Sequence, residues 1–150
     1  MSVTRAPIVR HGKVRWLCEP PHGVARLRVD SDAFTELPLS IPDGEPTAGE
    51  TTPGELLAVS YSAFMATDLA ERLERNGMPA NELVVQAWCR LSSEDAPRSV
   101  EGFDVEVHGR VRGIDEERFS CVASVALASC HRSLGMRRDL HTKLNVSLEH

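Results

Sequence analysis

Cysteine is the residue type in this chain that could carry covalent chemistry. The 150 residues include four, which are Cys18, Cys89, Cys121 and Cys130. A cysteine thiolate is both a nucleophile and a metal ligand, so their spacing decides which chemistry to consider. No Cys-x-x-Cys pair and no close pair of histidines is present, and the spacing therefore gives no zinc site. A chain of this length folds without disulfide staples, so we expect reduced thiols.

Other chemistries leave no signature in the sequence. A Gly-x-Ser-x-Gly elbow for serine hydrolysis is absent, as is a Gly-rich phosphate loop. The formal net charge is -5, which disfavours binding to a polyanion such as DNA. We therefore expect no metal, no cofactor and no nucleic-acid partner.

The sequence also predicts a cytoplasmic protein without a membrane partner. No apolar run approaches the roughly 18 residues that a membrane span needs. The start, from Met1 to Arg10, lacks the apolar core of a secretion signal. The end, Leu148-Glu149-His150, has the composition of a purification-tag stub, and we assign it no function.

Length and composition favour one globular domain over residues 1–150. Hydrophobic residues make up 41% and charged residues 26%, which is ordinary for a globular protein with one core. Alternating residues predict strands at Lys13–Leu17, Val24–Asp30 and Leu37–Ile41, with a turn at Pro20–Gly23 between the first two. The N-terminal third is therefore predicted to be a β-meander.

A long helix is predicted to follow. Thr52-Pro53-Gly54-Glu55 has the pattern of a capping box with proline at the first helical position, and Asn76-Gly77 is a left-handed stop signal. The first half of this helix is apolar nearly all round and must be buried. About two dozen residues at 1.5 Å each span about 35 Å, which is longer than a small domain needs to cover its sheet. The excess length indicates a partner subunit.

The C-terminal half adds strands and a second helix. That helix opens at Asp115-Glu116-Glu117, where acids favour the positive end of the helix dipole, and ends at Gly135. The predicted strands and their connection are Leu83–Leu91, the polar hairpin Ser92–Ser99, Val100–Val111 and Thr142–Ser147. The order β-β-β-α-β-β-α-β predicts an α+β fold with a largely antiparallel sheet.

Three segments carry a resemblance to a known family. The segment from Thr52 to Phe64 reads TPGELLAVSYSAF, Gly113-Ile114-Asp115 precedes the second helix, and Ala128-Ser129-Cys130 with Ser133 lies at that helix's end. In this order they resemble the osmotically inducible protein C and organic hydroperoxide resistance proteins (OsmC/Ohr), over most of the chain. The resemblance implies an intertwined homodimer and a thiol peroxidase of oxidative-stress defence.

The resemblance also implies where the family's chemistry would fall. In that family a cysteine in the central helix attacks the peroxide as a thiolate, supported by an arginine that a carboxylate orients. The attacking cysteine's position corresponds to Phe64, since Tyr61-Ser62-Ala63 matches the preceding triplet, and the carboxylate's position corresponds to Gly54. Glu55 is one residue further, about 100° round the helix, and is interpreted as a cap.

Two further family positions complete the pattern. The arginine belongs to the N-terminal region, where Arg15, Arg26 and Arg28 are all candidates. The family's second cysteine, which forms a disulfide with the first, corresponds to Cys130, and the proline that usually follows it is His131 here. The departures from the family pattern are therefore concentrated in the peroxidase chemistry.

The retained residues have structural and functional interpretations. Cys130 shares an apolar helical stripe with Phe119, Val122 and Ala126, so it is either a small core residue or a reactive thiol beside His131. Phe64 either packs in the core or lines a pocket for an apolar ligand. The residues of that pocket would be Trp16, Tyr61, Phe64 and Trp88.

Three functions follow from these interpretations. We favour an OsmC/Ohr relative without standard peroxidase activity, because two active-site positions are substituted together. The alternatives are a peroxidase that uses Cys130 as a relocated reactive thiol, and a non-catalytic dimeric module that binds an apolar ligand. The first alternative requires an exposed Cys130 of low pKa, whereas the second requires an apolar cavity near Phe64.

Overall fold

The structure is a computed structural model that describes residues 5–19, 22–40, 49–92, 99–137 and 139–150. The chain divides into two compact units, Met1–Pro53 and Gly54–His150, which we call the N-terminal and C-terminal units. One domain over the whole chain stays a prediction. No helix within the described ranges is long and apolar enough to cross a membrane.

The N-terminal unit is the predicted meander. Strands β1 (Gly12–Glu19), β2 (His22–Val29) and β3 (Leu37–Leu39) pair antiparallel in the order β1-β2-β3. The register places Val14 opposite Leu27 and Trp16 opposite Ala25, so residues of like character share a face. Pro20, Pro21 and Ile41, which the predicted turn and third strand include, lie outside the described residues.

The C-terminal unit contains both helices and a second three-stranded sheet. Its elements are α1 (Pro53–Arg75), β4 (Ala80–Leu91), β5 (Val100–Val111), α2 (Glu116–Ser133) and β6 (His141–Glu149). The predicted element order is confirmed. The centre of the predicted hairpin, residues 93–98, lies outside the described part of the chain.

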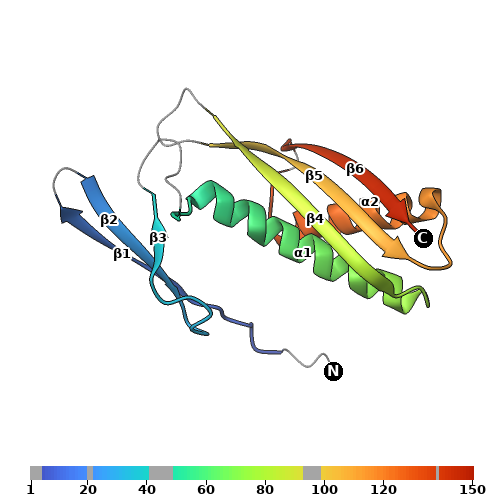
Figure 1. The fold of residues 1–150 in the computed structure, drawn as a ribbon, viewed down its shortest axis with the longest axis horizontal. Helices are drawn as coiled ribbons and strands as arrows, with labels where there is room; N and C mark the ends of the chain where they lie inside the picture. The colour runs from blue at the N-terminus through green and yellow to red at the C-terminus, as the bar shows by residue number, and fades with distance from the viewer. Residues whose placement is uncertain (1–4, 20–21, 41–48, 93–98, 138) are drawn as a thin grey trace. The chain divides into compact units, whose positions relative to one another are not determined.

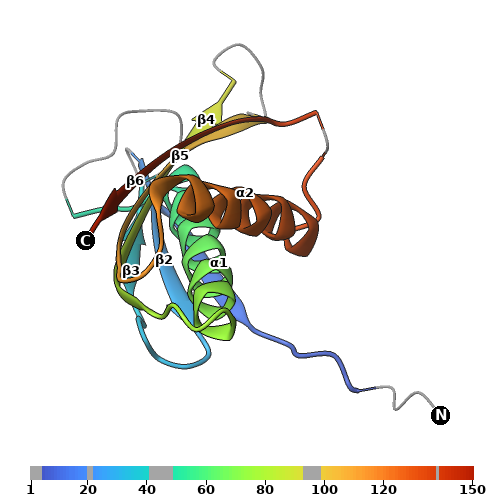
Figure 2. The same ribbon diagram turned by 90° about the vertical axis from the view of Figure 1, so that its right-hand side faces the viewer.

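The second sheet has the order β4-β5-β6, and α1 and α2 lie along the same face of it (Figures 1 and 2). Strands β4 and β5 are antiparallel, whereas β5 and β6 are parallel. The parallel pair arises because α2 crosses back over the sheet between these strands, so both run in one direction. The expectation of an α+β fold with mostly antiparallel pairing is confirmed.

The core of the C-terminal unit fills the space between the helices and the sheet. From α1 it takes Tyr61, Met65, Leu69 and Leu73, and from α2 it takes Phe119, Ala123, Ala126 and Cys130. These spacings of three and four residues put each set on one side of its helix. The set packs on Phe103, Val105, Val107 and Val111 of β5. Both helices are therefore fixed against β5.

Local signals position α2 on the sheet. Its first turn is capped by Asp115, whose Oδ1 accepts a hydrogen bond from the Arg118 amide at 2.7 Å. Phe119 then lies directly over Gly109, where a Cβ atom would come within 2.4 Å of the phenyl ring. A glycine in β5 is thus required for this close approach of helix and strand.

Candidate functional site

Cys130 and Phe64, the candidate thiol and the residue that the resemblance assigns to the attacking position, lie together in the C-terminal unit. Phe64 of α1 and Cys130 of α2 both line a groove of about 160 Å³ between the two helices. We call it the Cys130 groove. Its lining residues are Phe64, Thr67, Asp68, Glu71, Ser129, Cys130 and Ser133. Apart from Phe64 and Cys130, the lining is polar or acidic.

Cys130 is a buried lining residue of this groove. Its side chain is only 2% exposed, and its Sγ donates a weak hydrogen bond to the carbonyl oxygen of Tyr61 at 3.8 Å. Burial, followed by the negative charge of Asp68, raises the pKa of the Cys130 thiol to about 11. At neutral pH the group is therefore a thiol, which is a poor nucleophile.

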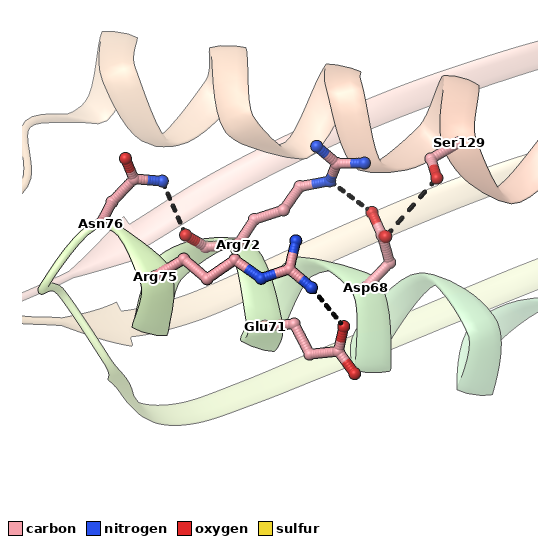
Figure 3. A network of polar contacts seen from close by, with 6 residues as sticks. All are labelled: Asp68, Glu71, Arg72, Arg75, Asn76 and Ser129. Carbon is pink, nitrogen blue, oxygen red and sulfur yellow. Dashed lines mark hydrogen bonds and ion pairs between the residues drawn. The ribbon is translucent and has the colours of Figure 1, made fainter. Parts of the chain in front are cut away.

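Asp68 is the main charged contact between the helices at this groove (Figure 3). Its Oδ2 accepts from Arg72 Nε at 2.6 Å, and its Oδ1 accepts from Ser129 Oγ of α2 at 3.5 Å. One turn away, Arg75 pairs with Glu71 at 3.3 Å. The guanidinium groups of Arg72 and Arg75 are thus paired with carboxylates. Neither of them is a cause of the shifted pKa of the Cys130 thiol.

Phe64 and Gly54, to which the resemblance assigns the substituted family positions, both belong to α1. Phe64 is 49% exposed and contributes an aromatic wall to the Cys130 groove. Gly54 lies in the first turn, and the neighbouring Glu55 carries the acidic charge there. Phe64 is therefore a large apolar residue in a groove whose other lining residues are mostly polar.

The three arginine candidates belong to the N-terminal unit. Arg28 pairs with Asp32 at 2.8 Å, and Arg26 donates to the carbonyl oxygen of Ala25 at 3.2 Å. Arg15 has an exposed side chain on β1. The family's arginine therefore stays unassigned among these three.

The four predicted pocket aromatics have different surroundings. Tyr61 is fully buried, with its ring stacked on Phe103 at a centroid distance of 4.5 Å. Trp88 of β4 is 47% exposed and does not line the Cys130 groove, and Trp16 is 57% exposed in the N-terminal unit. A pocket formed by all four stays a prediction.

A buried polar cluster links α1, α2 and β6. His131 Nε2 lies 2.7 Å from the Tyr61 hydroxyl and 3.2 Å from Thr142 Oγ1. Burial raises the pKa of Tyr61 and lowers the pKa of His131, so both groups are neutral at pH 7. Neutral His131 can accept the Tyr61 O–H through Nε2, which gives each buried group a partner.

Sequence reasoning named Cys130 and His131 but missed Asp68. The Asp68–Arg72 spacing of four residues predicts an ion pair along a helix, yet nothing local shows that Asp68 reaches Ser129 on another helix. Within the described ranges, no group of three or more His, Cys, Asp or Glu side chains is arranged to hold a metal ion.

The sequence and the fold were compared with those of known proteins. No family model and no curated protein matches the sequence. An organic hydroperoxide resistance protein from Elizabethkingia anophelis, with thiocyanate bound, matches with a TM-score of 0.71 at 19% identity, over 97% of this chain and 100% of that one.

Two further solved structures are similar to this chain in fold. OsmC from Legionella pneumophila, described as an organic hydroperoxide resistance protein, matches with a TM-score of 0.67 at 19% identity, over 95% of this chain and 99% of that chain. OhrB of Bacillus subtilis matches with a TM-score of 0.64 at 16% identity, over 93% and 98% of the two chains. The fold of this chain is therefore the OsmC/Ohr fold.

Proposed function

We propose that this protein is a relative of the organic hydroperoxide resistance proteins that does not work as a standard thiol peroxidase. The proposal is supported by the shared fold and by the two substituted positions, Phe64 for the attacking cysteine and Gly54 for the carboxylate. A phenylalanine cannot attack a peroxide, and a glycine cannot orient an arginine. On this correspondence, neither residue supplies the group that the family's chemistry needs at its position.

The state of Cys130 is the observation that carries the proposal. A relocated peroxidase would need Cys130 to be an accessible thiolate, because only the thiolate attacks the O–O bond. Instead the side chain is buried, and burial together with the negative charge of Asp68 raises its pKa. This environment opposes both requirements.

Phe64 supports a binding role as the second candidate. Its half-exposed ring in the Cys130 groove would contact a ligand that enters between α1 and α2. Hydroxyl and carboxylate groups make up most of the remaining lining, so that ligand must offer hydrogen-bond donors as well as apolar surface. A purely apolar ligand fits this lining poorly.

The protein is proposed to act as a cytoplasmic homodimer. Leu57, Val59 and Phe64 of α1 are 44%, 68% and 49% exposed in the single chain. Leu57 and Phe64 are seven residues apart and therefore lie on the same side of the helix, and exposed apolar side chains that share a face can form a subunit interface. Sedimentation equilibrium of the purified protein measures the subunit number directly, and a mass equal to one chain at all concentrations contradicts this part of the proposal.

Hydroperoxide consumption tests the proposed function. Purified protein is mixed with an organic hydroperoxide and a dithiol reductant, beside Cys130→Ser and a variant in which the other three cysteines are serine. We expect no turnover above that of the free dithiol. Turnover that disappears in Cys130→Ser and persists in the other variant would establish a peroxidase with a relocated cysteine and overturn the proposal.

A further inference from the structure

A second groove lies along α2, lined by residues that the proposed function does not use. It has a volume of about 360 Å³. We call it the His131 groove. Its lining residues are Ser124, Leu127, Ala128, His131, Arg132, Met136 and Arg137. This volume falls within the range of about 300–1,000 Å³ that is usual for small-molecule sites.

The His131 groove is basic in an acidic protein. Two of its lining residues are arginines and none is acidic, although the whole chain has a net charge of -5. Arg137 is held in place because its Nη2 donates to the carbonyl oxygen of Val100 at 3.3 Å, and its Nε lies 3.7 Å from Asp139. Asp139 offsets one of the two guanidinium charges.

Arg132 supplies the remaining positive charge. Its side chain is exposed in the last turn of α2, and within the described part of the chain it has no hydrogen bond or ion pair. A guanidinium in this state offers a planar pair of donors, which matches the two oxygens of a carboxylate. The groove therefore has an available anion-binding group next to one that is already positioned.

The rest of the lining is apolar. Leu127 and Met136 are partly buried and pack against the core of the C-terminal unit, and Ala128 adds a small apolar side chain to the lining. A methionine wall adapts its shape to ligands of different outline. A ligand that satisfies both parts of the groove carries one negative head group and a short apolar body.

We propose that the His131 groove binds small amphipathic monocarboxylates, with the carboxylate on Arg132 and Arg137 and the apolar body on Leu127 and Met136. This function goes beyond the one proposed above, because it requires neither Phe64 nor Cys130. Cys130 and His131 are consecutive in α2, and they line different grooves.

Octanoate is the probe that tests the site. Titration into ¹⁵N-labelled protein, followed by amide chemical shifts, is expected to give saturable changes at residues 124–137. Arg132→Gln is expected to weaken octanoate binding about tenfold, the loss that one charge-assisted hydrogen bond gives. Ala128→Phe, which fills the groove without changing charge, is expected to abolish it.

Control measurements distinguish binding in the His131 groove from nonspecific attraction to positive charge or apolar surface. Arg118→Gln removes the same charge from the first turn of the same helix, away from the groove, and is expected to leave the affinity unchanged. Octanol has the same apolar body without the carboxylate and is expected to bind at least about tenfold more weakly. Equal binding of octanol and octanoate, equal binding by Arg132→Gln, or shifts confined to the Cys130 groove would each overturn the proposal.

Discussion

The two grooves along α2 have opposite chemical character although they share one turn of helix. The Cys130 groove is lined by Asp68, Glu71 and three hydroxyl groups, whereas the His131 groove has two arginines and no acid. Consecutive helical residues point about 100° apart, so Cys130 and His131 are directed to these different surroundings. Sequence neighbours on a helix therefore need not share chemistry.

This separation explains why the presence of Cys130 does not by itself imply a thiol reaction. A reactive thiol needs a nearby cation or base to favour its charged form. Cys130 lies beside the carboxylate of Asp68, and the imidazole of His131 is engaged with the hydroxyls of Tyr61 and Thr142. The groove that contains the thiol thus opposes its ionisation.

The largest expected effect comes from Tyr61, which connects α1 to the cluster at His131. Tyr61→Ala removes a fully buried ring that stacks on Phe103, so it is expected to lower the free energy of unfolding by about 3–5 kcal/mol. Tyr61→Phe keeps the ring and loses only the hydroxyl, for which about 1–2 kcal/mol is expected. Urea unfolding followed by circular dichroism measures both. Equal losses would show that the ring packing contributes nothing.

A medium effect, on the reactivity of Cys130, is expected when the Asp68 carboxylate is removed. Asp68→Asn takes away the carboxylate that raises the pKa of Cys130 and frees the Arg72 guanidinium, so the pKa should fall while burial keeps it above the ordinary cysteine range. With the other three cysteines changed to serine, the alkylation rate at about pH 8 should increase by up to about tenfold, the factor that one pKa unit gives.

Glu71→Gln is the matched control for this change. Glu71 lines the same groove and pairs with Arg75, but it is not among the causes of the raised pKa of Cys130. The alkylation rate of this variant is expected to stay within about twofold of the parent, because Glu71 is exposed and paired with Arg75, and solvent screens exposed charges. A larger increase from Glu71→Gln than from Asp68→Asn would contradict the role given to Asp68.

The smallest effect concerns pH and the His131 groove. Burial lowers the pKa of His131 in the folded protein, so the unfolded chain binds the proton first as the pH falls. The stability that this group contributes is present above its unfolded pKa of about 6.5 and decreases as the pH falls toward the folded value.

His131→Gln tests this dependence. Glutamine can still bond to Tyr61 but does not titrate, so unfolding free energies measured between about pH 7 and pH 5 should decline less steeply than in the parent. His11→Gln, which changes an exposed histidine of the N-terminal unit, is the control and should keep the parent slope. Equal slopes for His131→Gln and the parent would show that His131 does not contribute to the pH dependence.

Much of the fold could be predicted because its signals are local. The capping pattern at Thr52–Glu55, the stop at Gly77 and the acids that open α2 predicted both helices, and alternation predicted the strands. The parallel pairing of β5 and β6 could not be predicted, because it depends on the direction in which α2 crosses the sheet.

The candidate site was less predictable because its contacts join distant residues. The Asp68–Ser129 and Tyr61–His131 contacts span 61 and 70 residues. The apolar stripe offered a buried Cys130 as one of two interpretations, but it did not indicate the carboxylate of Asp68 on α1 that raises the pKa of the thiol. The basic groove had no signal, since Arg132 and Arg137 flank the helix end without a motif.

Titration of the Cys130 thiol decides between an inert and a reactive cysteine. In a variant that keeps Cys130 and has serine at the other three cysteine positions, the ultraviolet absorbance of the thiolate is followed as the pH is raised. We predict a midpoint well above the ordinary cysteine range, near the pKa of about 11 set by burial and Asp68. A midpoint at or below neutral pH would contradict this prediction and identify Cys130 as a reactive thiolate.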